Sequence, residues 1–215
     1  MALPKPFYED GSVTIYHGDC REMLPSLTEP STDLLLTDPP YGMSYKPLRG
    51  SNGSKMWGDE TVTGDSKPFD PGHLLIFQRA VIWGAQWFAS RLPDSGGWLV
   101  WNKVAGGVRD GFIYSHAELA WTNTLSRVQL FSSNWQGSSR HGEGFFHPTQ
   151  KPTSLMRWVM EMEPEGTVVD PYAGSGSTLV AAKDLGRKAI GIELEERYCE
   201  IAAERCSQEV LDLSL

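Results

Sequence analysis

Short apolar runs alternate with amphipathic stretches along most of the chain. Runs with the length and side chains of β-strands occupy residues 13–16, 33–37, 80–83, 98–101, 119–122, 128–131, 167–169 and 189–192. Stretches with helical spacing occupy residues 21–27, 86–92, 153–162, 177–185 and 195 to about 209. Strands that alternate with helices predict an α/β fold, in which helices cover both faces of a mainly parallel sheet.

Two segments show neither pattern. Residues 42–72 are rich in Gly, Ser and Lys, and residues 132–147 are rich in Gly, Ser and His. Loops of this length inside a compact domain are usually functional or mobile. We therefore expect one domain over residues 1–215, with these two segments as functional loops.

The composition is that of a globular protein, with 40% hydrophobic and 11% aromatic residues. It excludes a disordered chain, a collagen-like repeat and a disulfide scaffold. The three cysteines, Cys20, Cys199 and Cys206, are too dispersed for a disulfide framework. No apolar run reaches the roughly 18 residues of a membrane span, and no signal-peptide core follows Met1. We therefore expect a cytoplasmic protein without a membrane partner.

The formal net charge of −8 argues against a protein that coats nucleic acid through bulk charge. Basic residues outnumber acidic ones only in the middle of the chain, over residues 98–158. A local contact with a polyanion therefore stays open, and so does an ordinary solvated surface. The histidines His73, His116 and His141 lack the spacing of metal ligands, and we expect no metal site.

A Gly-rich turn near the C-terminus is typical of a nucleoside site. The sequence from Thr167 to Gly176 predicts a strand that ends in Asp170, followed by a turn that contains Gly174 and Gly176. A second strand ends in Glu193, whose carboxylate is placed to bind ribose hydroxyls. Leu179 stands where a dinucleotide fingerprint has its third glycine. Asp170 also suits a cationic ligand better than a pyrophosphate, so S-adenosyl-L-methionine fits best; an ordinary strand-to-helix turn is the alternative.

The tetrapeptide Asp38-Pro39-Pro40-Tyr41 follows the apolar strand at 33–37. Ligands of open α/β sheets bind beyond the carboxyl ends of the strands. The two prolines remove backbone donors and restrict the backbone, which leaves the Asp38 carboxylate and a carbonyl as acceptors beside an aromatic ring. Such a group of acceptors suits a planar exocyclic amine. A Pro-rich turn with a surface aspartate is the alternative for this tetrapeptide alone.

These segments, in this order, resemble the permuted β group of the amino-group DNA methyltransferases. Three further segments match that family: Gly18-Asp19, Gly96–Lys103 and the His-Pro-Thr-Gln-Lys-Pro sequence of 147–152. The resemblance implies a Rossmann-like S-adenosylmethionine-dependent methyltransferase fold with a mainly parallel, seven-stranded sheet. The cofactor-binding residues that it implies are Asp19, Lys151, Pro152, Asp170, Tyr172, Ala173, Gly174, Gly176 and Glu193.

Within this reading, Asp38, Pro39, Pro40 and Tyr41 form the catalytic segment. Methylation at a ring carbon needs a cysteine nucleophile, usually after a proline, and no cysteine of this chain follows one. Transfer to an exocyclic nitrogen remains, with Asp38 and the Pro39 carbonyl accepting the two N–H bonds and the carboxylate stabilising the developing positive charge. The base must be flipped out of the duplex, and Tyr41 is the residue expected to stack on it.

The resemblance favours adenine N6 as the target, because aspartate at the first position is commoner among adenine enzymes. The alternatives are a cytosine-N4 enzyme, an N-methyltransferase of RNA or protein amides, and a non-catalytic nucleic-acid-binding module of the same fold. The two long loops carry basic side chains suited to phosphates, so we expect a short DNA target site. A partner subunit or homodimer that supplies specificity is the alternative. The DNA-contacting residues predicted are Lys46, Arg49, Lys55, Arg140 and His141.

Overall fold

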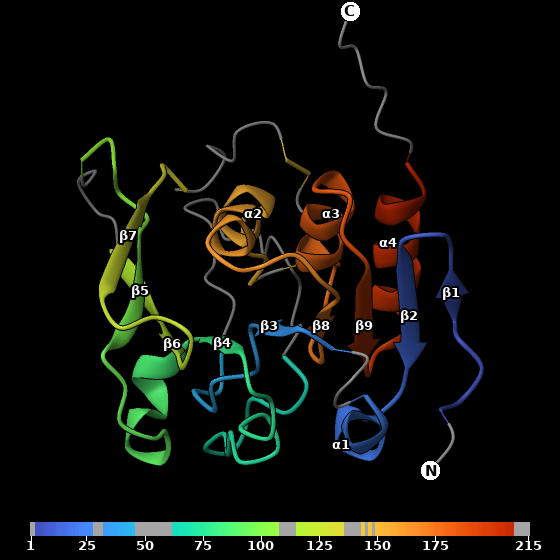
Figure 1. Cartoon of the computed structure of the whole chain (residues 1–215), viewed down its shortest axis with the longest axis horizontal. Coiled ribbons are helices and arrows are strands. Elements are labelled where there is room, and N and C mark those ends of the chain that lie inside the picture. The colour runs from blue at the N-terminus through green and yellow to red at the C-terminus, as the bar shows by residue number, and fades with distance from the viewer. Residues whose placement is uncertain are drawn as a thin grey trace, which may run out of the picture.

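The strands form one nine-stranded sheet (Figure 1) in the order β1-β2-β9-β8-β3-β4-β6-β5-β7. The computed structural model describes residues 3–27, 32–45, 62–107, 115–135, 143–144, 146–147 and 149–208. The strands are β1 (Tyr8–Glu9), β2 (Val13–His17), β3 (Leu34–Thr37), β4 (Ala80–Trp83), β5 (Gly97–Asn102), β6 (Ala117–Thr122), β7 (Val128–Ser132), β8 (Val168–Asp170) and β9 (Ala189–Glu193). The five strands from β2 to β4 run parallel, and β6 turns antiparallel to β4.

The expectation of a seven-stranded sheet is wrong, because one strand is added at each edge. β1 pairs antiparallel with β2, and the turn between them is held by the Asp10 carboxylate, which accepts from the amides of Ser12 and Val13 at 2.7 Å. β7 pairs in parallel with β5, and Phe131 on it packs against Trp158 at a ring separation of 5.3 Å. The mainly parallel arrangement is confirmed.

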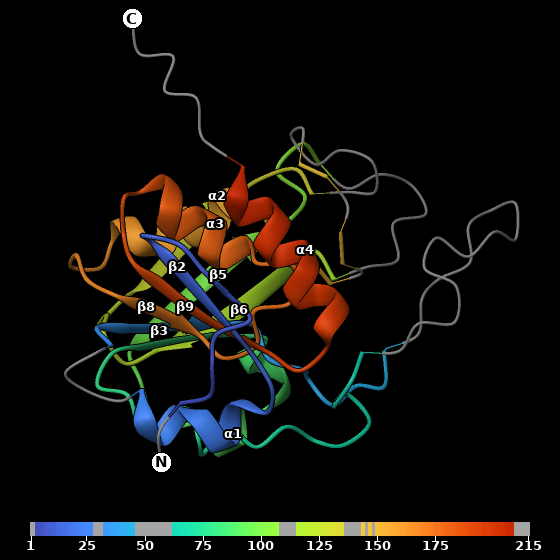
Figure 2. The same ribbon diagram turned by 90° about the vertical axis from the view of Figure 1, so that its right-hand side faces the viewer.

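Helices cover both faces of the sheet, as Figure 2 shows. The helices are α1 (Cys20–Met23), α2 (Thr153–Glu161), α3 (Ser177–Asp184) and α4 (Glu196–Ser207), and the 3-10 turns are η1 (Leu24–Ser26), η2 (Ala85–Trp87) and η3 (Ala89–Arg91). The helix predicted at 86–92 is instead the pair η2 and η3, because Phe88 between them leaves the helical conformation. Among the described residues, none of the helices has the length and apolar character needed to cross a membrane.

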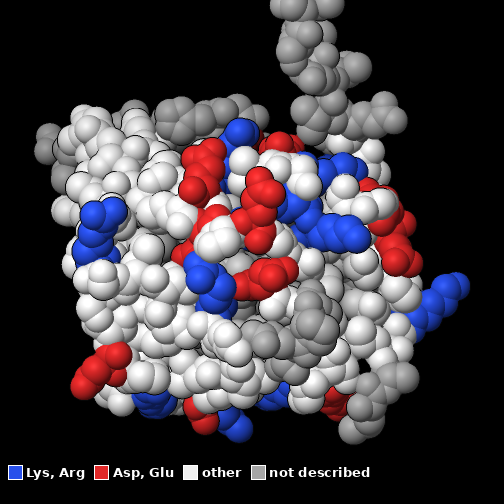
Figure 3. Space-filling model, viewed as in Figure 1, with Lys and Arg blue, Asp and Glu red and all other residues white. Residues whose placement is uncertain are grey.

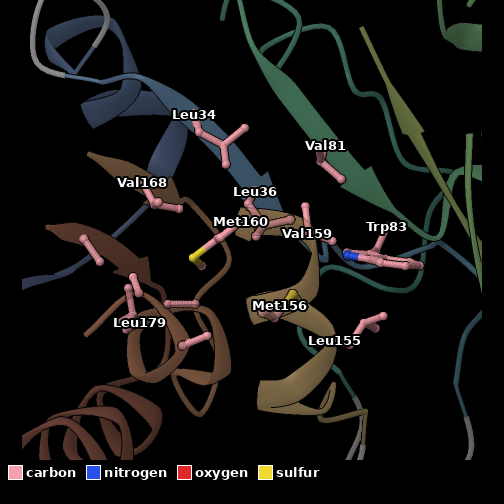
Figure 4. Packing of buried hydrophobic residues seen from close by; sticks show 14 of the residues in the cluster. Leu34, Leu36, Val81, Trp83, Leu155, Met156, Val159, Met160, Val168 and Leu179 are labelled. Carbon is pink, nitrogen blue, oxygen red and sulfur yellow. The ribbon is translucent and has the colours of Figure 1, made fainter. Parts of the chain in front are cut away.

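Two apolar clusters lie on the two faces. The larger packs α2, α3 and α4 onto the sheet (Figure 4), with Leu36, Val81 and Trp83 from the strands meeting Leu155 and Val159 of α2. The other face is covered by α1, the 3-10 turns and the segment around Phe69 and Leu74. All three cysteines are buried in these clusters and are free thiols.

The carboxyl ends of the five parallel strands all lie on the same side of the sheet. Because β2, β9, β8, β3 and β4 run in the same direction, the residues at or just beyond their carboxyl ends lie along the same side of the sheet. These residues include Asp19, Glu193, Asp170, Asp38 and Gly84. The strand order therefore brings the Asp38 segment after β3 next to the Gly turn after β8, although the two segments stand far apart in the sequence.

Candidate active site

Asp38 stands at the end of β3, where three polar groups meet. Its Oδ2 accepts a hydrogen bond from Lys151 Nζ at 2.6 Å, and its Oδ1 accepts one from Tyr41 Oη at 2.5 Å. Lys151 Nζ also donates to Tyr41 Oη at 2.8 Å. The predicted catalytic residues Asp38 and Tyr41 are therefore joined, and Lys151, which was expected near the cofactor, contacts both of them.

The backbone around Asp38 is held from two sides. Thr37, the last residue of β3, donates from Oγ1 to Asp170 Oδ1 at 2.7 Å, so the two predicted sites share a hydrogen bond. Beyond Tyr41, the Asp65 carboxylate accepts from the amides of Gly42 and Tyr45 at 2.7 and 2.5 Å. This cap orders the start of the loop that the sequence leaves without a pattern.

Glu118 and Lys103 extend the charged group and were missed by the sequence reasoning. Glu118 Oε2 lies 3.1 Å from Lys151 Nζ, and Glu118 Oε1 lies 2.9 Å from Lys103 Nζ. Glu118 belongs to β6 and pairs with Trp101 of β5. The sequence offered one signal for Glu118. It shares a face of β6 with Ala120 and Thr122, so a charged side chain stands beside two uncharged ones.

Burial and charge compete in setting the pKa values of this group. Burial raises the pKa of Asp38 above its usual range, although Lys151 acts in the opposite direction. Burial also raises the pKa of Glu118, but the ammonium groups of Lys151 and Lys103 outweigh it and bring the value to about 2. Burial lowers the pKa of Lys151, and the carboxylates of Asp38 and Glu118 more than compensate, so the net shift is upward. Glu118 and Lys151 are thus held charged.

The ring of Tyr41 packs on the backbone of Gly84, directly after β4. Gly84 has a φ of +72°, and a Cβ at this position would lie 1.8 Å from Tyr41 Cε1. Trp83 and Trp101 are buried and meet edge to face at 6.5 Å, so both belong to the core. Trp135 packs partly buried on Trp101, at 6.3 Å.

The predicted cofactor residues gather at the ends of β8 and β9. Glu193 accepts from the amide of Gly174 through Oε2 and from the amide of Glu195 through Oε1, both at 2.8 Å. Gly174 has a φ of +50°, and a Cβ built on it would meet nothing within 4 Å. Gly176, with a φ of +81°, packs against Ala202 of α4. A half-buried carboxylate beside open space and a Gly turn fits the ribose of a nucleoside cofactor.

The other predicted cofactor residues line or support this turn. Asp170 is buried, and its Oδ1 also accepts from the amide of Tyr172 at 3.1 Å. Ala173 donates its amide to the carbonyl of Ile192, and Asp19 caps α1 by accepting from the amide of Arg21 at 2.9 Å. Pro152 precedes the first residue of α2.

His73 is a third residue that the sequence reasoning did not place. Its Nε2 lies 2.8 Å from Tyr172 Oη, and both rings meet Phe69 edge to face. Burial lowers the pKa of His73 below its usual value, which favours the neutral imidazole. Its position next to the Gly turn depends on the packing of segment 69–77, which no motif announces.

All five predicted DNA contacts lie outside the described residues; they are Lys46, Arg49, Lys55, Arg140 and His141. Within the described part of the chain, no group of three or more His, Cys, Asp or Glu side chains could hold a metal ion.

Comparison with known sequences finds DNA methylases. Residues 98–204 match a family profile described as DNA methylase. YubD of Escherichia coli (strain K12), described as a methylase, is 30% identical over 87% of each chain. The type II methyltransferase M2.DpnII of Streptococcus pneumoniae is 26% identical over 97% of this chain and 95% of its own length.

Solved structures share the fold. The structure of the M1.HpyAVI–SAM complex has a TM-score of 0.57 and 22% identity, and the match covers 91% of this chain and all of that one. The cytosine-N4-specific PvuII DNA methyltransferase has a TM-score of 0.60 and 19% identity over 98% of this chain and 90% of its own. The expected Rossmann-like methyltransferase fold is thereby confirmed, with two strands beyond the seven expected.

Proposed function

The chain belongs to the N6/N4 family of DNA methylases, and from this membership we propose that it methylates the N6 amine of adenine in DNA, with Asp38 as the residue that binds the amine. Members of this family are S-adenosyl-L-methionine-dependent, and DNA is their substrate. The proposal has three parts: adenine is the target base, individual residues have the roles given below, and one methyltransferase domain spans residues 1–215.

One observation carries the assignment of the site. The hydrogen bond from Thr37 Oγ1 to Asp170 Oδ1 joins the residue before Asp38 to the residue that begins the Gly turn. β3 and β8 are neighbours in the sheet, so the amine-binding carboxylate and the cofactor turn are held in a constant relation. In-line methyl transfer needs a fixed distance and orientation between these two sites, because reacting atoms must be held at about 3–3.5 Å with their orbitals aligned.

S-adenosyl-L-methionine, when bound, supplies a methyl group on a positively charged sulfur, which a neutral amine can attack. Gly174 leaves open space beside Glu193, and we assign the ribose hydroxyls to the Glu193 carboxylate. Asp38 accepts an N–H of the target amine, which draws the nitrogen lone pair out of the ring system. As the N–C bond forms and the C–S electron pair stays with sulfur, the Asp38 carboxylate stabilises the positive charge on nitrogen. Its raised pKa then suits it to accept the proton that the nitrogen releases.

The target base has to leave the duplex to reach Asp38. Flipping costs a few kcal/mol, and stacking on an aromatic side chain returns roughly 1–3 kcal/mol per base. We assign this stacking to Tyr41, whose hydroxyl is tied to Asp38 and Lys151 and whose ring is backed by Gly84. The aromatic group and the acceptor are thus presented as one rigid unit.

The test is methyl transfer by the purified chain from labelled cofactor to DNA, RNA and protein in parallel, followed by nucleoside mass spectrometry of the DNA. We expect N6-methyladenine in DNA alone. N4-methylcytosine would move the target to the other base, and label in RNA or protein would replace the substrate class.

Asp38→Ala provides the matched variant for this test. It should abolish transfer while the cofactor dissociation constant stays within a few-fold, because the proposed partner of Asp38 is the amine. Turnover near that of the wild type would remove Asp38 from the mechanism. Cofactor binding without transfer to any DNA, by the wild type itself, would favour a non-catalytic binding module.

A further inference from the structure

Four charged side chains of alternating sign stand in a row beside the proposed amine site. Lys103 Nζ lies 2.9 Å from Glu118 Oε1, Glu118 Oε2 lies 3.1 Å from Lys151 Nζ, and Lys151 Nζ lies 2.6 Å from Asp38 Oδ2. Lys103 directly follows β5, Glu118 belongs to β6, Lys151 precedes α2, and Asp38 directly follows β3. The side-chain exposure of each is 15% or less. Glu118 belongs to none of the segments that mark the family in this sequence.

The proposed reaction creates a competition at Asp38. Lys151 and Tyr41 already donate to its two carboxylate oxygens. An ammonium–carboxylate contact has two charged partners, whereas an amine N–H donated to the same carboxylate has only one. The ammonium therefore holds Asp38 against the incoming amine unless it is offered an equivalent partner. Moving it away without such a partner would leave an unpaired buried charge, which is strongly destabilising.

We propose that Glu118 is a positioning residue for methyl transfer, which takes the Lys151 ammonium from Asp38 when the target amine binds. This inference rests on the proposed function of Asp38. Lys151 exchanges one carboxylate for another and stays paired throughout. Asp38 then presents an oxygen to the amine with its negative charge no longer balanced by a contacting ammonium.

The geometry prepares Glu118 for this exchange. Its Oε1 is held by Lys103, which directs Oε2 towards Lys151. The buried Oε2 lies within ion-pair distance of Lys151 Nζ but has no aligned hydrogen bond, so it has acceptor capacity to spare. The ring of Trp101 lies under both ammonium groups, at 5.2 Å from Lys103 Nζ and 6.0 Å from Lys151 Nζ. A small rotation of the Lys151 side chain completes the transfer.

The exchange also serves the chemical step. Positive charge develops on the target nitrogen during transfer, and a carboxylate stabilises it best when no other cation is in contact with that carboxylate. With Lys151 still on Asp38, the site would hold two positive centres on one acid. With Lys151 on Glu118, each carboxylate serves one cation.

The experiment compares Glu118→Gln with the wild-type chain in steady-state and single-turnover transfer to DNA. We expect kcat and the single-turnover rate to fall about 10- to 100-fold. The cofactor dissociation constant and the KM for DNA should stay within about threefold, because Glu118 touches neither ligand in this proposal. A purely structural role would instead change stability and cofactor affinity together.

Glu163→Gln is the matched control. Glu163 is also a buried glutamate paired with a basic side chain, Arg79, but it lies beyond the end of α2, away from Asp38. The Glu163→Gln substitution should lower the thermal stability of the chain without lowering kcat. A folded Glu118→Gln chain whose kcat stays within about threefold of the wild type would overturn the proposal. If the wild type transfers no methyl group, the proposed function fails first, and the two failures are distinguished.

Glu118→Asp carries the test if Glu118→Gln does not fold. It keeps the charge but shortens the reach by one methylene, so Lys151 is released from Asp38 less completely. We expect kcat to fall about three- to tenfold at unchanged cofactor affinity. An unchanged kcat would overturn the proposal.

Discussion

Asp170 shows how a single buried acid can link the cofactor site to stability. Burial outweighs the hydrogen bonds from Thr178, Thr37 and Tyr172 and raises the pKa of Asp170 to about 6. An aspartate in an unfolded chain has a pKa of about 3.9. Between these two values the folded chain keeps a proton that the unfolded chain has lost. The free energy of unfolding should therefore decrease as the pH rises from about 4 to about 6, by about 3 kcal/mol from this group.

Asp170→Asn should remove this decrease. The amide keeps an oxygen for Thr37 and Tyr172 but has no charge to bury. Urea unfolding at about pH 4 and pH 7 should show a smaller loss of stability in the variant than in the wild type. Asp184→Asn, the same change at an exposed position of α3, should keep the wild-type difference. An equal pH response of the wild type and Asp170→Asn would contradict the assignment.

At the scale of elements, the end of β4 supports the catalytic segment through a glycine. The left-handed Gly84 allows the ring of Tyr41 to lie against the backbone, and a Cβ would collide with that ring. Gly84→Ala should therefore displace Tyr41 and reduce transfer about tenfold or more, since small misplacements in an active site are costly. Cofactor affinity, measured by calorimetry, should change little because Gly84 is not near Glu193 in the sheet order.

Gly186→Ala separates this effect from backbone strain. Gly186 follows α3 with a φ of +68°, and a Cβ there would meet nothing within 4 Å. Gly186→Ala should lose about 1–2 kcal/mol of stability, the usual cost of a left-handed residue with a side chain. Gly84→Ala should lose at least as much, because the collision with Tyr41 adds to this cost. Only Gly84→Ala should lose activity. Equal activities in the two variants would show that the Tyr41 ring does not need this contact.

At the scale of the whole molecule, DNA binding has to overcome a net charge of −8. Figure 3 shows basic and acidic side chains interspersed on the side of the molecule that is turned to the viewer. We expect the basic residues of 42–72 to supply phosphate contacts, so binding should weaken steeply with salt. Lys46→Ala should weaken binding to all sequences alike and reduce the slope of log K against log salt by about 0.9.

Lys188→Ala is the control for that charge change. Lys188 is exposed and lies just before β9, at the amino ends of the parallel strands, whereas Asp38 lies at their carboxyl ends. Titrations at several salt concentrations should leave its slope at the wild-type value. If the two variants behave alike, net charge rather than a phosphate contact governs binding.

The sequence by itself determined the elements and the two functional segments. All of the predicted strand runs form strands, because alternation and apolar content are local properties that the chain expresses wherever it folds. The Gly turn after β8 and the Asp-Pro-Pro-Tyr segment after β3 were likewise readable, because their glycines and prolines restrict the backbone locally. The helix predicted at 86–92 failed for a local reason too, in the conformation of Phe88.

Only the tertiary structure decided the order of the strands and the partners of the charged residues. The two-residue β1 is too short to carry a pattern, and it exists because β2 offers an edge. Lys151 meets Asp38 across 113 positions of sequence, and Glu118 reaches Lys151 because β6 turns antiparallel beside β4. Periodicity reports which face of an element is buried but not which element covers it. The charge row beside Asp38 therefore arises from strand order, which no local pattern encodes.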